Sequence, residues 1–284
     1  MEVIKKVCTN NRCYKAGRKI TVGGLMLHSV GCPQPRASVF VNAWNRASAG
    51  VCPHGIIDGD NGAAYQTLPW NHRGWHCGSG PRGSGNDTHI GIEMCEPANI
   101  EYTGGANFKC KNTAAAKKSV KKTYKSAVKL FSMLCKRYGL APLADGAVIS
   151  HREGCARGIA TNHGDPEHLW RGLGLGYTMD TFRAAVFAKM HGVNLTFETG
   201  KAYTVTKPCY LRSSAGVKSA NIAPYRDVSL ILKSKCKNKN GNAVFLKGKT
   251  IRLTDVRIVN GDVWGRMKNG WWIALVYNGE IRIK

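Results

Sequence analysis

The stretch that decides the fold lies in residues 19–30, an apolar run that begins Lys19-Ile20-Thr21-Val22-Gly23-Gly24-Leu25-Met26-Leu27 and delivers His28 at its end. A second apolar run, residues 89–95, carries Glu93. Short continuous apolar runs of this kind are typical of strands that are buried on both faces. We therefore predict two buried strands, each of which presents a polar side chain at or near its end.

The clearest helix is predicted for residues 114–138, where apolar residues recur at spacings of three and four and lysines occupy the other side. The apolar positions are Val120, Tyr124, Ala127, Val128, Phe131, Leu134, Cys135 and Tyr138, and the lysines are Lys117, Lys118, Lys121, Lys122, Lys125 and Lys129. Gly139 fits the helix stop. Residues 36–47 and 179–190 also have helical spacing. Buried strands combined with such helices predict an α/β fold, a mixed central sheet with flanking helices.

The pattern changes after Gly192, and we place a domain boundary between residues 195 and 196. From residue 203 onward, short strand-like runs alternate with turn signals. The expected strands are residues 203–205, 228–232, 244–246, 250–253, 263–266 and 271–277. Asn260-Gly261 and Asn269-Gly270 predict hairpin turns. We therefore expect a domain in residues 1–195 and a small all-β module in residues 196–284.

The formal net charge of +25 restricts the partners of the chain. Such an excess of positive charge favours an anionic partner, which would be nucleic acid, an anionic membrane surface or an anionic polymer such as a bacterial cell wall. The charge is spread over both predicted domains, and the sequence has no helix-turn-helix, RNA-binding or zinc-finger signature. These features argue against a nucleic-acid-binding protein.

The 11 cysteines are scattered singly, without a Cys-x-x-Cys pair. We expect small buried thiols in a reducing cytoplasm rather than disulfides or a cysteine zinc site. No apolar stretch approaches the ~18 residues that a membrane span needs. The start, Met1-Glu2-Val3-Ile4-Lys5-Lys6-Val7-Cys8, has no apolar run after basic residues. We therefore expect synthesis in the cytoplasm without a secretory signal.

Polar side chains that could hold a metal follow the ends of apolar runs. His28 ends the first run, His151 follows Ala147-Val148-Ile149-Ser150, and Asp165 lies in Asn162-His163-Gly164-Asp165-Pro166. Two imidazoles and one carboxylate suit zinc in a catalytic site with an open position. The alternative for each histidine is a surface or core role without metal, and His168 competes with Asp165 as the third ligand.

Six short pieces, in order across roughly residues 20–170, resemble the zinc-dependent N-acetylmuramoyl-L-alanine amidases of the type-2 family. They are Leu27-His28-Ser29, His54-Gly55-Ile56-Ile57-Asp58, Gly74-Trp75-His76-Cys77-Gly78, Asn86-Asp87-Thr88-His89-Ile90-Gly91-Ile92-Glu93, Ser150-His151-Arg152-Glu153 and His163-Gly164-Asp165-Pro166. This family includes phage lysins, bacterial anhydro-muropeptide amidases and animal peptidoglycan-recognition proteins. The resemblance implies that His28, His151 and Asp165 bind Zn²⁺.

The resemblance also implies two catalytic residues. Glu93 would help to deprotonate the attacking water, with Glu153 as the next candidate base. His163 stands where members of the family often carry a lysine, and it would stabilise the oxyanion of the tetrahedral intermediate. Since histidine titrates near neutrality, whether His163 acts charged or neutral stays open. In a second departure, Pro53 precedes His54 where some members have a tyrosine.

Four further residues are candidates for substrate binding. Trp75 and His76 would line the groove of the catalytic domain, with core packing as the alternative for His76. The second domain resembles bacterial SH3-like wall-binding modules in Tyr203-Thr204-Val205, Tyr210-Leu211-Arg212-Ser213-Ser214, Val263-Trp264 and Trp271-Trp272. This resemblance implies peptidoglycan peptides or wall polymers as ligands, and Trp271 and Trp272 are either binding surface or core.

These features together predict a modular peptidoglycan hydrolase of the endolysin type. Its first domain would cut the amide between N-acetylmuramic acid and L-alanine, and its second would attach to the wall. The lysine-rich face of residues 114–138 is either a solvated surface or a contact for wall teichoic acids. The enzyme would reach the wall after release from the host cytoplasm. The alternatives are a non-catalytic peptidoglycan-binding protein on the same fold and a basic nucleic-acid-binding protein.

Overall fold

The computed structural model describes residues 2–284, which form two compact units that meet in the sequence between Leu175 and Gly176. This division lies before helix α6 (Met179–Met190), whereas the boundary that we predicted at residues 195 and 196 lies after it. Within the second unit, α6 packs against strand β13 (Thr250–Val259).

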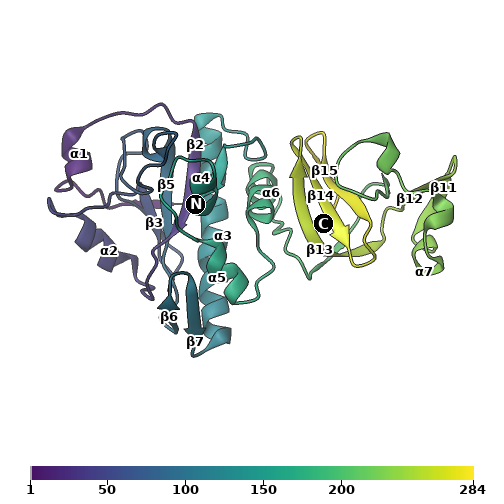
Figure 1. Cartoon of the computed structure of the whole chain (residues 1–284), viewed down its shortest axis with the longest axis horizontal. Coiled ribbons are helices and arrows are strands. Elements are labelled where there is room, and N and C mark those ends of the chain that lie inside the picture. Colours follow the sequence, from purple (N-terminus) through teal and green to yellow (C-terminus); the bar gives the residue numbers. More distant parts are fainter. Residues whose placement is uncertain (1) are drawn as a thin grey trace. The chain divides into compact units, whose positions relative to one another are not determined.

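The first unit is built on a six-stranded mixed sheet with the order β1-β4-β3-β5-β2-β8 (Figure 1). The strands are β1 Val3–Lys5, β2 Gly24–Ser29, β3 Gly55–Ile57, β4 Ala64–Gln66, β5 His89–Met94 and β8 Val148–Ser150. Strand β2 pairs in parallel with β5 and β8, and β5 pairs in parallel with β3. Every residue of β2 is buried, as expected for an inner strand of a parallel sheet. The predicted mixed sheet is confirmed.

The helices of the first unit are α1 Arg12–Ala16, α2 Ala37–Trp44, α3 Thr113–Tyr138, α4 His151–Ala156 and α5 Glu167–Gly172, and η1 (Gly85–Asp87) is a short 3₁₀ turn. Helix α3 runs alongside the sheet and packs on β3 and β5 (Figure 1). Its predicted apolar positions from Val120 to Cys135 are buried. The helix ends as predicted, because Gly139 adopts a left-handed conformation with a φ of 65°.

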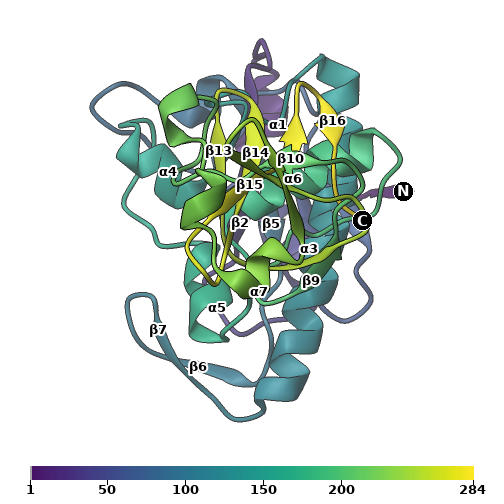
Figure 2. The ribbon, with the colours of Figure 1, turned by 90° about the vertical axis from the view of Figure 1, so that its right-hand side faces the viewer.

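A hairpin in the first unit was not predicted. Strands β6 (Ile100–Gly104) and β7 (Asn107–Cys110) pair in antiparallel register and form a separate two-stranded sheet. The hairpin projects from the lower end of this unit in both ribbon views, and β7 lies beside α5 (Figure 2).

The second unit is an antiparallel half-barrel of β-strands, preceded by α6. One sheet has the order β16-β15-β14-β13-β9 and another has the order β10-β12-β11. Besides β13, the elements are β9 Ala202–Thr204, β10 Cys209–Tyr210, η2 Ser219–Asn221, η3 Tyr225–Asp227, α7 Leu230–Lys233, β11 Cys236–Lys239, β12 Asn242–Phe245, β14 Asp262–Met267, β15 Trp272–Tyr277 and β16 Glu280–Ile281. The predicted all-β character is confirmed.

One predicted strand of the second unit is wrong and one predicted turn is confirmed. Residues 228–232 do not form a strand, because they run into the single helical turn α7, and Leu230 and Ile231 are each 84% exposed. A short apolar run fits a helical turn as well as a strand, so periodicity alone could not decide between them. The turn between β13 and β14 places Asn260 and Gly261 at φ values of 52° and 79°, as a type I′ hairpin requires.

All 11 cysteines are free thiols in the structure; seven are buried as expected, whereas Cys13, Cys32, Cys110 and Cys155 are half-buried. Within residues 2–284, no helix is both long enough and apolar enough to cross a membrane.

Candidate metal centre and active-site pocket

The pairing of three parallel strands positions the site. His28 on β2 lies directly opposite Glu93 on β5, so both side chains project from the same face of the sheet. On the other side of β2, Leu27 lies opposite Ser150, the last residue of β8. Helix α4 begins immediately after Ser150, and His151 is its first residue. The sheet therefore brings two distant histidines to one edge.

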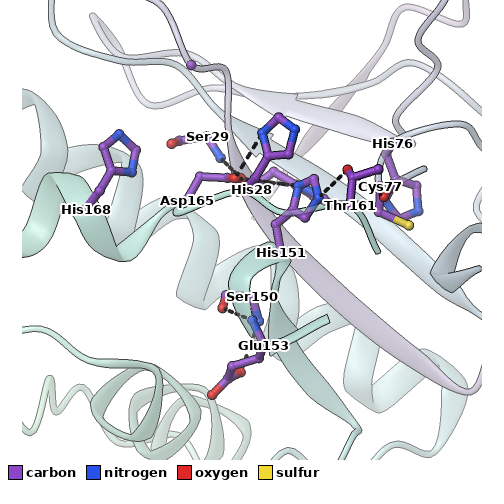
Figure 3. Close-up of polar contacts among 12 residues, drawn as sticks. His28, Ser29, His76, Cys77, Ser150, His151, Glu153, Thr161, Asp165 and His168 are labelled. Atoms are coloured by element: carbon purple, nitrogen blue, oxygen red, sulfur yellow. Dashed lines mark hydrogen bonds and ion pairs between the residues drawn. The ribbon is translucent and has the colours of Figure 1, made fainter. Parts of the chain in front are cut away.

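A capping box fixes the start of α4. The Ser150 hydroxyl accepts a hydrogen bond from the Glu153 backbone N–H at 3.1 Å, and the Glu153 carboxylate accepts one from the Ser150 N–H at 3.1 Å. Glu153 points away from the histidines (Figure 3). This carboxylate caps a helix, which leaves Glu93 as the acidic side chain that faces the site.

His28, His151 and Asp165 converge on one point (Figure 3). The two Nδ1 atoms lie 3.0 Å apart, and each lies 3.5 Å from a different carboxylate oxygen of Asp165. All three residues are buried, and the Ser29 backbone N–H holds the Asp165 carboxylate with a hydrogen bond of 3.1 Å. The three predicted ligands are thus brought together.

The geometry of this cluster fits a zinc ion. Two ligand atoms bound tetrahedrally at 2.0–2.1 Å are roughly 3.3 Å apart, which agrees with the observed separations of 3.0 and 3.5 Å. Two imidazoles and one carboxylate are also a donor set that catalytic zinc uses. Within residues 2–284, this is the one group of at least three His, Cys, Asp or Glu side chains that meets the spacing for a metal.

His168, the alternative third ligand, lies outside the cluster (Figure 3). Its Nε2 atom lies 2.7 Å from the hydroxyl of Tyr102 on the β6–β7 hairpin, and that hydroxyl donates to Glu96 at 2.7 Å. Glu96 is completely buried, which raises the pKa of its carboxyl to about 7. These three residues form a polar anchor for the hairpin.

The electrostatics of the cluster follow from burial and from the facing carboxylates. Burial lowers the pKa of His151 to about 4, so this imidazole is neutral at physiological pH. Burial also acts to lower the pKa of His28, but the carboxylates of Asp165 and Glu93 outweigh it and raise this pKa. Burial acts to raise the pKa of Asp165, and the hydrogen bond and charge of His28 outweigh that effect and lower it.

The cluster forms part of the wall of a pocket of about 800 Å³. Glu93 also lines this pocket, and its Oε2 atom is buried without a hydrogen-bond partner in the described part of the chain. Burial raises the pKa of Glu93 to about 7. A buried carboxylate oxygen without a partner is costly unless a ligand or a water completes it. Glu93 is therefore placed to act on a molecule in the pocket.

His163 lies at the same pocket and is the more exposed catalytic candidate. Its side chain is 60% exposed, and its ring stacks on that of His151 with centroids 4.5 Å apart. Its Nδ1 atom lies 4.0 Å from the nearer carboxylate oxygen of Asp165. A side chain with this combination of exposure and proximity can reach a substrate that enters from solvent.

The four predicted substrate-binding residues have different environments. His76 lines the pocket, but its ring is hydrogen-bonded to that of His28, with 3.0 Å between Nδ1 of His76 and Nε2 of His28. Trp75 is 42% exposed, lies under the guanidinium of Arg73 and is not among the residues that line this pocket. In the second unit, Trp272 is 5% exposed and belongs to a core cluster, whereas Trp271 is partly exposed.

Two features at or near the site were not predicted from the sequence. Gly105 and Ala106 at the tip of the β6–β7 hairpin line the pocket together with Tyr102. The second feature is the hydroxyl of Thr161, which lies 3.3 Å from Nε2 of His151. The Gly104-Gly105 pair is a recognised turn signal and could have indicated the hairpin. Thr161 has no comparable signal.

Comparison with known proteins identifies the class. A family model described as N-acetylmuramoyl-L-alanine amidase matches residues 17–168, and the chain belongs to this family. Among curated proteins, the N-acetylmuramoyl-L-alanine amidase CwlH of Bacillus subtilis (strain 168) is 46% identical over 43 residues, which are 15% of this chain and 17% of CwlH. The amidase CwlA of a Bacillus species is 30% identical over 95 residues, 29% of this chain and 36% of CwlA. The chain therefore spans well under half of the length of these relatives.

Solved structures that are similar to this chain include the catalytic domain of XlyA, with a TM-score of 0.47 and 22% sequence identity; the match covers 66% of this chain and 99% of that domain. The hydrolase AmiA of Staphylococcus aureus, solved in complex with its ligand, has a TM-score of 0.49 and 18% identity over 68% of this chain and 87% of AmiA.

Proposed function

We propose that this protein is a zinc-dependent amidase that hydrolyses the bond between N-acetylmuramic acid and L-alanine in peptidoglycan. The observation that carries this proposal is the convergence of His28, His151 and Asp165 beside Glu93, whose buried carboxylate oxygen has no partner among the described residues. Membership of the N-acetylmuramoyl-L-alanine amidase family supports the choice of bond and substrate.

The roles of the residues follow from their positions. Nδ1 of His28, Nδ1 of His151 and a carboxylate oxygen of Asp165 would hold the zinc ion. When bound, zinc supplies Lewis-acid chemistry, which polarises a carbonyl and acidifies a water. Glu93 lies next to His28 across the β2–β5 pair and faces the pocket, so it would accept the proton of the attacking water. The protonated Glu93 would then deliver that proton to the leaving amine of L-alanine.

His163 would stabilise the oxyanion that develops on the scissile carbonyl. Its ring stands over His151 at the wall of the pocket and is exposed enough to donate a hydrogen bond to a bound substrate. Removing one oxyanion donor typically costs about 10²–10³-fold in kcat. A His163→Lys variant would place at this position the lysine donor that members of the family often carry.

The reaction itself is tested on purified cell walls. We expect the protein to release free amino groups of L-alanine without releasing reducing sugar ends, and we expect a chelator to abolish this release and added zinc to restore it. Zymography on walls from several hosts would show the range of substrates. New reducing ends would instead indicate a glycosidase, and wall binding without any new end group would indicate a non-catalytic peptidoglycan-binding protein.

We further propose that the second unit is an SH3-like module that tethers the enzyme to peptidoglycan or to anionic wall polymers. Its antiparallel half-barrel supports this proposal, and so do four exposed lysines on or near β11 and β12: Lys237, Lys239, Lys247 and Lys249. A tether raises the local concentration of substrate without a new catalytic contact. In pelleting assays with purified walls, the first unit alone, residues 1–175, should bind more weakly than the whole chain while retaining some lytic activity.

We also propose that the protein acts as an endolysin, made in the host cytoplasm and released to the wall through a membrane lesion that another protein makes. Its 11 free thiols support synthesis in a reducing compartment. Cells that express the protein alone should stay intact, and they should lyse when the membrane is permeabilised. Lysis without permeabilisation would contradict this route.

A further inference from the structure

A chain of hydrogen bonds behind His28 determines which of its ring nitrogens faces the metal site. Nε2 of His76 lies 3.1 Å from the backbone carbonyl of His89, and Nδ1 of His76 lies 3.0 Å from Nε2 of His28. A carbonyl can only accept, so Nε2 of His76 carries the hydrogen and Nδ1 of the neutral ring must accept. Nε2 of His28 therefore donates, so in the neutral ring the lone pair lies on Nδ1, the atom that faces the metal site formed with His151 and Asp165.

A second chain of hydrogen bonds does the same for His151 (Figure 3). The Thr161 hydroxyl donates to the backbone carbonyl of Cys77 at 3.2 Å, and the Thr161 backbone N–H donates to the same carbonyl at 2.9 Å. The hydroxyl oxygen is then free to accept from Nε2 of His151, which lies 3.3 Å away. Nδ1 of His151 is thereby left with its lone pair directed at the cluster.

Both relays pass through two adjacent residues, the side chain of His76 and the carbonyl of Cys77. Asn86, which is fully buried, clamps this segment. Its carbonyl oxygen accepts from the backbone N–H groups of His76 at 2.7 Å and of Cys77 at 3.3 Å, and its amide donates to the Gly78 carbonyl at 2.9 Å. The ring of His76 occupies the space above Gly91, where a Cβ atom would collide with it.

We propose that His76 and Thr161 are positioning residues that hold the Nδ1 atoms of His28 and His151 toward a common zinc ion. This inference rests on the proposed zinc-dependent function. In place of the substrate-binding role that we predicted for His76, it assigns His76 and Thr161 to hydrogen bonds that orient the two ligand histidines. Outer partners of this kind typically contribute 10–100-fold to metal affinity, because they fix the tautomer and the orientation of the ligand ring.

The first test compares two nearly isosteric substitutions of His76 in the full-length protein. His76→Leu removes the acceptor, whereas the amide oxygen of His76→Asn stands close to the position of the original Nδ1. The zinc dissociation constant, measured by competition with a chromophoric chelator, should rise roughly 10–100-fold in His76→Leu and recover most of that loss in His76→Asn. Equal zinc affinity in the wild type and His76→Leu would overturn the role of His76.

Thr161 and Gly91 provide independent variants. Thr161→Val should weaken zinc binding, whereas Thr161→Ser, which keeps the hydroxyl, should bind zinc like the wild type. The effect of Thr161→Val should be smaller than that of His76→Leu, because Thr161 is exposed and water can replace its hydroxyl. Gly91→Ala should weaken binding by displacing the His76 ring. Two matched controls, His191→Leu in the second unit and Gly50→Ala, whose Cβ would meet open space, should leave zinc affinity unchanged.

A spectroscopic measurement on the wild type needs no variant to fold. Long-range ¹⁵N–¹H spectra of the zinc-loaded protein should show His28 and His151 with a hydrogen on Nε2 and the metal on Nδ1. Coordination through Nε2 of either histidine would overturn the relay at that residue. These outcomes are distinct from failure of the proposed function, in which the wild-type protein would bind no zinc and would release no L-alanine amino groups from walls.

Discussion

The two units of this protein differ in whether they gather buried polar side chains into one cluster. The first buries them: His28, His151 and Asp165 are almost completely enclosed and lie within hydrogen-bonding range of other side chains. The second buries single polar residues such as Glu198 and Asp262 that form no such cluster, and it leaves most of its lysines exposed. Within Gly176–Lys284, no group of His, Cys, Asp and Glu meets the spacing for a metal. Chemistry is therefore expected from the first unit, and attachment through charge and shape from the second.

This contrast predicts effects of different size. The largest is expected for a metal ligand in the first unit, because His151→Ala removes one of three donor atoms. The loss of zinc affinity should exceed the roughly 10–100-fold that is typical of an outer partner. Elemental analysis of the purified variant should find little zinc, and lysis of walls should fall to background. Near-stoichiometric zinc in this variant would remove His151 from the site.

Glu93 should separate catalysis from metal binding. Glu93→Gln keeps the shape of the side chain but cannot accept a proton, so activity on walls should fall by about 10²–10⁴-fold while zinc content stays at the wild-type level. Glu153→Gln serves as the control, since that carboxylate caps α4, and its effect should appear as lower thermal stability. An active Glu93→Gln enzyme would require a different base.

The polar anchor of the β6–β7 hairpin should make stability depend on pH. Burial raises the pKa of Glu96 from 4.5 to about 7, so the folded protein retains a proton that the unfolded chain loses. Stability should therefore fall as the pH rises from about 4.5 to about 7, by about 3 kcal/mol at 1.4 kcal/mol per pKa unit.

In urea unfolding of metal-free protein, the loss of stability between pH 5 and pH 8 should be smaller in Glu96→Gln than in the wild type. Glu101→Gln, an exposed glutamate of the same hairpin paired with Lys111, is the matched control and should behave like the wild type. The same pH dependence in Glu96→Gln and in the wild type would show that Glu96 does not carry this proton.

The smallest effects are expected on the surfaces, where salt screens each charge. Two full-length variants, each with four Lys→Glu changes, compare the units. One changes Lys237, Lys239, Lys247 and Lys249, and the other changes the exposed α3 residues Lys118, Lys125, Lys129 and Lys136. The first should lose more wall binding in low-salt pelleting assays. A greater loss in the α3 variant would transfer the wall contact to the first unit.

Much of the site could be predicted from the sequence because its parts lie at the ends of apolar strands. His28 and Glu93 belong to strands whose burial is evident from composition, and their parallel register places them side by side. His151 follows an apolar run that ends at a helix cap. Helix α3 was predictable for the same reason, since its apolar face has a clear helical period.

The remaining features depend on contacts that no local pattern encodes. His76 and Thr161 act through hydrogen bonds to residues 48 and 10 positions away in the chain. The β6–β7 hairpin has weak strand signals and lies on the pocket because Tyr102 bonds to Glu96 and His168. In the second unit, the run at residues 228–232 was misread because a short apolar run fits a helical turn as well as a strand; Val228 and Leu232 are buried there, whereas Leu230 and Ile231 are exposed.

The most direct test of the account is hydrolysis of purified walls by the full-length protein before and after removal of metal. We expect that metal-free protein releases no L-alanine amino groups, that one equivalent of zinc per chain restores the release, and that zinc does not restore it in Asp165→Ala. Full activity in the metal-free protein, or restored activity in Asp165→Ala, would contradict the claim that His28, His151 and Asp165 form the catalytic zinc site.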